Sequence, residues 1–149
     1  MKRFEYPLES VLRLRRFAEA EARQALQQAL AARFAAEQAL ATTRGRIGAA
    51  MVRLQHQLPE AEAAAVVAAW DELERLEHLA LKQAATLADC ESAVQARTAE
   101  YVAAQRERKP LERLKEEMLR THRHEADLVE QAQHDELAVL GFSRKGGDK

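Results

Sequence analysis

Five histidines and one cysteine are the side chains that could do chemistry in this 149-residue chain. His122 and His124 lie two residues apart, so on a helix they point about 200° apart and cannot ligate one metal ion. Glu130 and His134 have the i, i+4 spacing of neighbours on a helix surface, where such pairs are common. The lone Cys90 leaves no partner for an internal disulfide or a thiolate cluster. We therefore predict no metal site, and we expect Cys90 to be a small packing residue.

Motifs that build an enzyme's active site are missing from the sequence. Catalysis needs a concave, water-excluding pocket that holds titratable groups of perturbed pKa. The sequence holds neither a Gly-rich phosphate loop nor a nucleophile elbow. Runs of charge such as residues 113–117 are typical of solvated helix faces. We predict a protein that is not an enzyme, has no cofactor and takes no small-molecule substrate.

Alanine dominates the elements that would have to position any site. The chain is 47% hydrophobic, but 31 of its residues are alanine and only 5% are aromatic. Such a composition lacks the bulky side chains that fill a thick globular core. Alanine has the highest helix propensity and permits close helix–helix contact. The composition therefore predicts an elongated all-α protein.

The charge pattern bears on partners and compartment. A net charge of −1 argues against a nucleic-acid or nucleoid-binding protein, because phosphate affinity rests on a cationic surplus. Residues 1–58 carry a net +5 and residues 59–149 a net −6, which fits either two mutually attracting helices or two mixed solvated faces. Neither a membrane-spanning run of about 20 apolar residues nor a signal-peptide core is found. We expect a cytoplasmic protein.

A first long helix is expected over about residues 7–58. Pro7 suits the first helical position, and Glu9 then lies in the favourable first turn. Gly45 and Gly48 each cost about 1 kcal/mol relative to alanine, so they either permit a close approach or loosen the helix. The apolar residues predict a coiled-coil seam with local stutters after Ala18 and Thr43. Its members are Val11, Leu14, Ala18, Ala22, Ala25, Ala29, Ala32, Ala36, Ala39, Thr43 and Ile47.

A turn over residues 59–69 and a second helix over about 70–140 complete the predicted hairpin. Leu58-Pro59 breaks the first helix, the alanine-rich turn has room for a short helix, and Pro110 should kink or split the second helix. Gly141 resembles a C-cap, followed by a disordered tail over 141–149. The second seam runs through Leu73, Leu76, Ala80, Ala84, Leu87, Val94, Thr98, Tyr101, Leu111, Leu114, Met118, Thr121, Leu128 and Ala132. The fold class is thus a long antiparallel two-helix coiled-coil hairpin forming a single domain, 1–149.

The helix lengths place the two chain termini at the same end of the hairpin. The first helix, about 50 residues long, would span roughly 75 Å, so a second helix of 70 to 80 residues reaches or overhangs its start. Trp70, the sole tryptophan, lies beside the turn. It either stays partly exposed as part of a partner site, with Leu73, Leu76 and Ala80 on the same face, or plugs the wide end of the hairpin.

Three segments together resemble the FliJ family of flagellar type III export proteins, with injectisome YscO-type proteins as cousins. They are residues 4–15 (FEYPLESVLRLR), residues 70–76 (WDELERL), and a C-terminal part with residues 111–117 (LERLKEE) and 134–138 (HDELA). The resemblance covers most of the chain. It implies a monomeric antiparallel hairpin, similar to the central stalk of rotary ATPases, that works at the cytoplasmic side of the inner-membrane export apparatus. Its implied partners are the hexameric export ATPase, the membrane export gate and the export chaperones.

The resemblance also implies two binding surfaces. The ATPase-facing end carries over onto Leu8, Leu12, Arg13, Arg16, Asp135, Glu136 and Leu137. The gate contact carries over onto Gln38, Thr42, Leu76 and Ala80. One departure from the family is that Gly45 and Ala49 stand where relatives often have aromatic residues. The main alternative is a coiled-coil scaffold or dimerising spacer unrelated to an ATPase.

Overall fold

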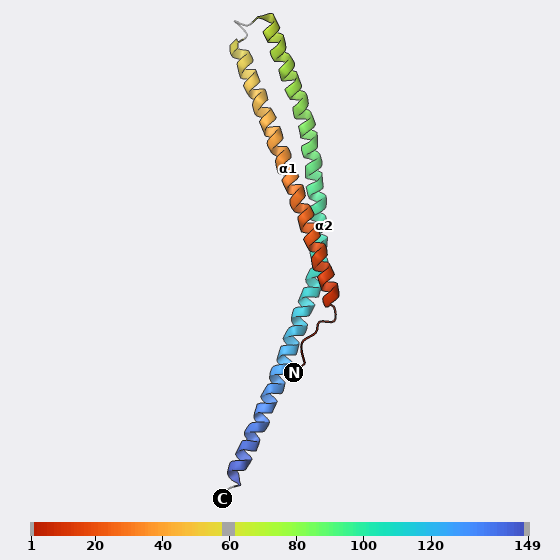
Figure 1. Ribbon diagram of the computed structural model, residues 1–149, viewed down its shortest axis with the longest axis vertical. Coiled ribbons are helices and arrows are strands. Elements are labelled where there is room, and N and C mark those ends of the chain that lie inside the picture. Colours follow the sequence, from red (N-terminus) through yellow and green to blue (C-terminus); the bar gives the residue numbers. More distant parts are fainter. Residues whose placement is uncertain (1, 58–61, 148–149) are drawn as a thin grey trace. The chain divides into compact units, whose positions relative to one another are not determined.

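Two long helices make up the protein. The structure, a computed structural model, describes residues 2–57 and 62–147. Helix α1 covers Glu9–Gln57 and helix α2 covers Ala63–Gly146, and the two pack against each other as a helical hairpin (Figure 1). The predicted all-α hairpin fold is therefore confirmed. Neither described helix has a stretch that is long and apolar enough to cross a membrane.

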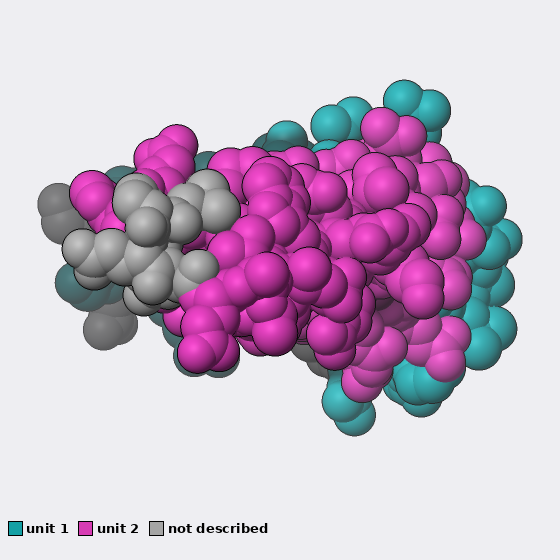
Figure 2. Space-filling model, turned by 90° about the horizontal axis from the view of Figure 1, so that it is seen from above, with its two compact units in different colours: residues 1–18, 104–149 teal, residues 19–103 magenta. Residues whose placement is uncertain are grey.

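The chain divides into two compact units, and each contains part of both helices. Unit 1 comprises Met1–Ala18 and Ala104–Lys149, and unit 2 comprises Glu19–Ala103 (Figure 2). Ion pairs and ring contacts join residues that are far apart in the sequence, and each of these contacts lies within a single unit. The single domain expected from the sequence stays a prediction.

A regular heptad seam holds the two helices of unit 2 together. Along α1, shielded side chains recur from Glu19 to Leu54 in steps that alternate between three and four residues. Along α2 the same alternation runs from Val66 to Val94. This 3.5-residue period is the signature of coiled-coil packing. The seam is closed near the turn by a cluster of buried residues, namely Ala50, Leu54, Leu73 and Leu76, with Ile47 and Ala69 packed against it.

The two columns of the α1 seam differ in size. One column is almost entirely small and holds Ala22, Ala29, Ala36, Thr43 and Ala50, whereas the other holds Leu26, Arg33, Leu40, Ile47 and Leu54. Small residues along one column let the backbones approach closely, and the larger column supplies the buried apolar area. The antiparallel direction follows from two contacts: the Tyr101 ring centroid lies 5.8 Å from the Arg23 guanidinium carbon, whereas Leu54, farther along α1, packs in the cluster with Leu73.

The stutters predicted for the first helix are wrong. The seam passes through Leu26 and Leu40, whereas Ala32 and Ala39, which the sequence pattern placed in it, are exposed. Alanine occurs on every side of α1, so apolar identity alone does not locate the packed face.

Polar side chains inside the seam hid its regularity. Glu19 is 6% exposed and Thr43 is 3% exposed. The Thr43 hydroxyl donates a hydrogen bond to the Ala39 carbonyl at 3.1 Å, which satisfies it within its own helix. Arg33 keeps its aliphatic stem in the seam, and its Nε lies 3.5 Å from an Oε of Glu37. Glu19 and Arg33 occupy positions that a purely apolar pattern treats as interruptions, whereas Thr43 was already part of the predicted series.

The start of α1 lies two residues later than expected. The Glu9 N–H donates to the Tyr6 carbonyl at 3.1 Å, so Pro7 and Leu8 form the centre of a turn before the helix begins. Proline is favoured at this position of a turn because its φ is already fixed there. Glu9 is in the first helical turn, as predicted.

Helix α2 is longer at both ends than expected. It begins at Ala63 rather than residue 70, so the predicted turn over 59–69 is wrong for residues 63–69, whose alanines favour helix. It continues to Gly146, so the predicted C-cap at Gly141 and disordered tail are wrong for residues 141–146. Arg144 and Lys145 lie in the last turn, where positive charge favours the helix dipole. The predicted break at Leu58-Pro59 lies outside the described residues.

Proline at position 110 does not split α2. The helix continues on both sides of Pro110, whose ring is exposed, while the shielded residues Arg108 and Leu111 on either side keep the heptad spacing. Proline removes one backbone hydrogen bond, but here it does so on a face where the ring clashes with nothing from α1.

Candidate partner-binding surfaces

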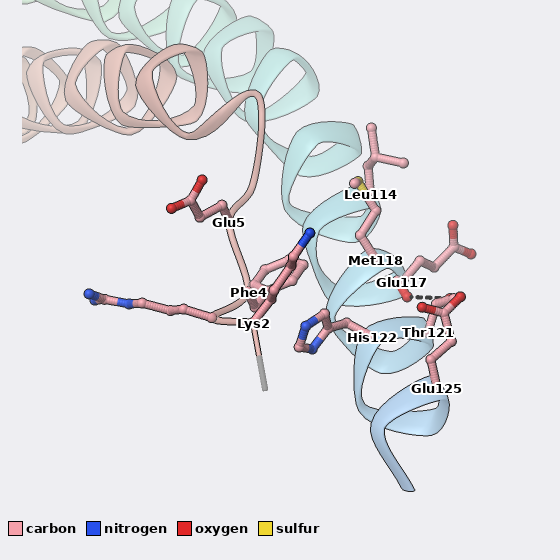
Figure 3. A pocket seen from close by; sticks show the side chains of 10 residues that line it. Lys2, Phe4, Glu5, Leu114, Glu117, Met118, Thr121, His122 and Glu125 are labelled. Carbon is pink, nitrogen blue, oxygen red and sulfur yellow. Dashed lines mark hydrogen bonds between the residues drawn. The ribbon is translucent and has the colours of Figure 1, made fainter. Parts of the chain in front are cut away.

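The N-terminal residues of unit 1 form a strap along α2. We call residues Lys2–Tyr6 the strap. Tyr6 is 7% exposed, and its hydroxyl donates a hydrogen bond to the Leu111 carbonyl at 2.9 Å. The Phe4 ring meets the His122 ring edge-on, with centroids 5.5 Å apart and planes at 61°. In Figure 3 the Phe4 side chain extends from the strap and the His122 side chain from α2, and the two lie next to each other. Aromatic contacts and one hydrogen bond therefore anchor the strap.

Ion pairs connect the first turns of α1 to α2. Lys115 Nζ lies 2.8 Å from Glu9 Oε2, and Arg15 lies 2.7 Å from Glu107. Arg16 donates its Nε–H to Glu112 at 2.8 Å, and Arg108 pairs with the same carboxylate. All seven residues therefore carry charges that are already engaged within the chain, and the pairs between the two helices fix the register of α1 on α2.

These contacts lower the pKa of two carboxyl groups. The hydrogen bond from Lys115 is the main reason that the pKa of Glu9 lies below its ordinary value. The hydrogen bond from Arg16, followed by that from Arg108, lowers the pKa of Glu112 despite a desolvation cost in the opposite direction. Hydrogen bonds to the ionised form stabilise it, so both groups are carboxylates at neutral pH.

The four residues near the start of α1 that were predicted to face an ATPase differ in accessibility. Leu12 is fully buried at 0% exposed, so its side chain packs inside unit 1. Leu8 is 37% exposed. Arg16 is held by Glu112, whereas Arg13 is exposed and makes no ion pair within the described part of the chain. Leu8 and Arg13 are thus the members of this group that are free to contact a partner.

The C-terminal part of α2 is an unpartnered helix. Residues 127–147 are exposed throughout. They include large apolar side chains that are more than half exposed, namely Leu128, Val129, Leu137, Val139, Leu140 and Phe142. Asp135 and Glu136 line a shallow groove with Val139 and Leu140. Apolar side chains held out in solvent at this density mark a surface that a partner covers.

The structure does not bring the two halves of the predicted ATPase-facing end together. The start of α1 pairs with α2 at Lys115, whereas Asp135 lies 20 residues farther along the same helix, or about 30 Å. Asp135, Glu136 and Leu137 therefore form a surface separate from Leu8 and Arg13. The register of the hairpin could not be predicted, because the pattern of an alanine-rich seam does not define which residues lie opposite each other.

The residues predicted to contact the gate are also divided. Gln38 and Thr42 are exposed on α1. Leu76 is 5% exposed in the cluster that closes the unit 2 seam, and Ala80 is half-buried in the same seam. Leu76 and Ala80 face α1, so their first role is to hold the hairpin together.

Trp70 is available to a partner, as one of the two interpretations of the sequence expected. It is 54% exposed, and it is off the seam that carries Leu73 and Leu76. Exposed apolar neighbours in the same part of unit 2 escaped the sequence pattern; they are Met51, Val52 and Val67. A groove nearby is lined by Ala50, Arg53, Leu54, Ala65, Ala68, Ala69 and Glu72. The heptad pattern would have located Met51, Val52 and Val67, because they lie outside its core positions. It would also have located the groove, which lies at the open edge of the seam.

The histidines are in ordinary helix-surface positions. Glu130 Oε1 and His134 Nε2 lie 3.8 Å apart, as the i, i+4 spacing predicts. The His122 ring packs against the Phe4 ring. Across residues 2–57 and 62–147, the side chains do not gather into a group of three or more metal ligands.

Comparison with known proteins identifies one family. The family model described as "Flagellar FliJ protein" matches residues 4–147, which is nearly the whole chain. Neither the search of curated proteins nor that of solved structures found a match. The match includes both helices and the strap aromatics Phe4 and Tyr6.

Proposed function

The chain belongs to the FliJ family, and from this premise we propose that it is a non-enzymatic stalk component of the flagellar type III protein export apparatus. The family consists of structural, chaperone-like export components, so the chain is a flagellar export-related protein. In the proposed stalk role, the chain acts on the cytoplasmic side of the inner membrane. The family match over residues 4–147 is the observation that carries it.

The proposed ATPase-binding residues form two surfaces in unit 1. Leu8, just before α1, and Arg13 on α1 form the first and are accessible; Asp135, Glu136 and Leu137 on α2 form the second and are exposed and unpartnered. Arg13 would pair with acidic loops of the ATPase ring, which makes the contact sensitive to salt. Leu12, which is buried, and Arg16, which is bound to Glu112, hold the first surface in place.

The proposed gate-binding surface lies in unit 2. Gln38 and Thr42 are exposed on α1, and Trp70 offers a large apolar side chain on α2. Between residues 38 and 57, α1 carries three arginines and no acidic residue. Arg44, Arg46 and Arg53 are exposed, so this surface favours a partner with apolar and acidic groups. Export chaperones are further candidates for it.

The mechanism follows from the asymmetry of a single hairpin. A rod that contacts only some subunits of a hexameric ring stabilises closed, hydrolysing states in those subunits. Its effect on the equilibrium is limited to the difference in its affinity for the closed and open states. The chain itself hydrolyses nothing in this mechanism.

The test is addition of the purified chain to the export ATPase from the same organism. We expect more ring assembly, faster ATP hydrolysis and co-elution in size-exclusion chromatography with light scattering. Leu137→Ala should weaken all three, and Leu81→Ala is the matched control, because the two leucines are 65% and 69% exposed on the same helix. A stable dimer that is indifferent to the ATPase would instead identify a coiled-coil scaffold and refute the stalk proposal.

Gate binding has a built-in reporter. Trp70 is the only tryptophan, so its fluorescence reads out a single site. We expect the cytoplasmic domain of the gate protein to protect Trp70 from acrylamide quenching, and Thr42→Arg to weaken that protection. Thr86→Arg is a control on an exposed α2 threonine. Unchanged quenching at saturating gate domain would exclude Trp70 from the interface.

A further inference from the structure

The face of α2 that packs under the strap continues beyond it. The shielded residues Leu111, Lys115, Met118 and His122 define one side of the helix. At 100° per residue, Ala126, Val129, Gln133, Leu137 and Leu140 fall on the same side, within about 80° of one another. We call these five residues the distal face. Four of the five are apolar, and Val129, Leu137 and Leu140 are 58%, 65% and 61% exposed.

The strap occupies the place that a helix occupies elsewhere along the hairpin. Before α1 begins at Glu9, Tyr6 and Phe4 cover the same face of α2, where they contact Leu111 and His122 respectively. Figure 3 shows the strap running beside α2, with Phe4 directed at His122. Lys2 of the strap lines a cleft with Ala126, Val129 and Gln133, whereas the strap leaves Leu137 and Leu140 uncovered. The seam between the helices is therefore an established interface whose α2 half extends farther than its α1 half.

The charges around this face indicate the chemistry of its occupant. From residue 124 to residue 143, α2 carries five acidic residues and neither lysine nor arginine. Lys2 of the strap lines one cleft with Glu125 and Glu130, and Lys2 and Arg3 line another with Glu117. The chain thus already places a short basic and aromatic segment on the acidic, apolar side of α2. An occupant of the distal face would have the same chemistry.

We propose that the strap is an intramolecular substitute for a partner helix, and that a basic amphipathic helix of a partner protein binds the distal face and displaces the strap from His122 and Leu111. The proposal rests on the proposed function in that it assumes a protein partner at this end of the chain. The partner binds only chains whose strap is released from α2. Its apparent affinity is therefore reduced in proportion to the fraction of chains in that released state. Binding by the partner would exchange Phe4 and Tyr6 for apolar side chains of a longer helix.

The probe is a fluorescein-labelled synthetic 21-residue helix with leucine at heptad positions a and d and lysine at the flanking e and g positions. Its matched control carries glutamate in place of lysine. Binding to the full chain is measured by anisotropy. We expect the basic peptide to bind and the acidic one not to bind. Hydrogen exchange should then show protection of the backbone amides of residues 126–140 in the complex.

Two sets of variants test the strap and the acidic rim. Phe4→Ala with Tyr6→Phe should raise the affinity for the basic peptide about threefold to tenfold, since an aromatic contact and a hydrogen bond no longer compete. The matched control is Phe34→Ala with Tyr101→Phe, which removes the same groups from unit 2. Glu130→Gln with Glu136→Gln should weaken binding. Glu74→Gln with Glu77→Gln is its control, because Glu74 also lies i, i+4 from a histidine.

The outcomes separate this inference from the proposed function. Equal affinity of the strap variants and the wild-type chain, equal binding of the two peptides, or a lack of added protection over residues 126–140 would each overturn the inference. None of these results affects stimulation of the export ATPase by the wild-type chain. Conversely, a chain that binds the basic peptide as expected but leaves the ATPase unchanged would refute the stalk role while the distal face stands as a helix-binding site.

Discussion

Leu76→Ala distinguishes a packing role from a direct role in gate binding. Leu76 is 5% exposed and belongs to the buried cluster with Ala50, Leu54 and Leu73. Truncation to alanine removes three carbon groups, which corresponds to about 2 kcal/mol of transfer free energy. A cavity adds to this cost in thick cores, but two helices can close part of the gap. We therefore expect the free energy of unfolding to fall by about 2–3 kcal/mol.

The matched control is Leu81→Ala on the same helix. Leu81 is 69% exposed, so its truncation should change the free energy of unfolding by less than about 0.5 kcal/mol. The gain in helix propensity from leucine to alanine is common to both variants and cancels in the comparison. Urea unfolding followed by circular dichroism at 222 nm gives both values. Loss of gate binding by Leu76→Ala with unchanged stability would refute the reasoning and make Leu76 a contact residue.

Three further perturbations test the helices and the ion pairs. Gly45→Ala and Gly48→Ala should each stabilise the chain by about 0.5–1 kcal/mol, because a Cβ at either site meets nothing within 4 Å; a loss of stability in urea unfolding would reveal a hidden contact. Pro110→Ala should raise the unfolding free energy by about 2 kcal/mol by restoring a helical hydrogen bond, and an unchanged thermal midpoint would contradict this. The lowered pKa of Glu112 stabilises the fold above its ordinary value of about 4.5, and this stabilisation is lost as pH falls through the lowered pKa. Glu112→Gln should thus cost about 1 kcal/mol or less at pH 7 and nothing at pH 2, whereas a cost that is independent of pH would exclude the carboxylate as its source.

Helix existence was predictable, whereas the packed face of α1 was not. Long runs without proline and a high alanine content specify helix through local propensity, so both helices and their pairing follow from the sequence. The packed face depends on which residues meet across the seam. Leu26 and Leu40 lie beside Ala25 and Ala39, and the sequence pattern chose the alanines because they extended an apolar series. Buried Glu19 broke the true series at the first inferred stutter, and half-buried Arg33 broke it between Ala32 and Ala36.

The candidate sites show the same limit. Leu76 and Leu12 are apolar residues within segments that resemble a family, and sequence alone does not separate a leucine that contacts the other helix from one that contacts a partner. Their burial, at 5% and 0% exposed, makes that distinction. Arg16 was expected to face an ATPase, but it binds Glu112. The two residues are 96 positions apart in the sequence, and only the register of the hairpin brings them together. The exposure of Trp70 was anticipated as one of two alternatives.

The uninterrupted heptad seam of unit 2 restricts how its length can change. The contact between Arg23 and Tyr101 fixes a register that sets residues 26–32 of α1 alongside residues 92–98 of α2. Removing both segments together takes one full repeat from each strand and restores every remaining side chain to its former neighbour. A deletion that is not a multiple of seven would turn the seam residues beyond it toward solvent, and a deletion of seven in one helix alone would shift them past their former neighbours. Evolutionary insertions and deletions in this part of the chain should therefore come in sevens and in matched pairs.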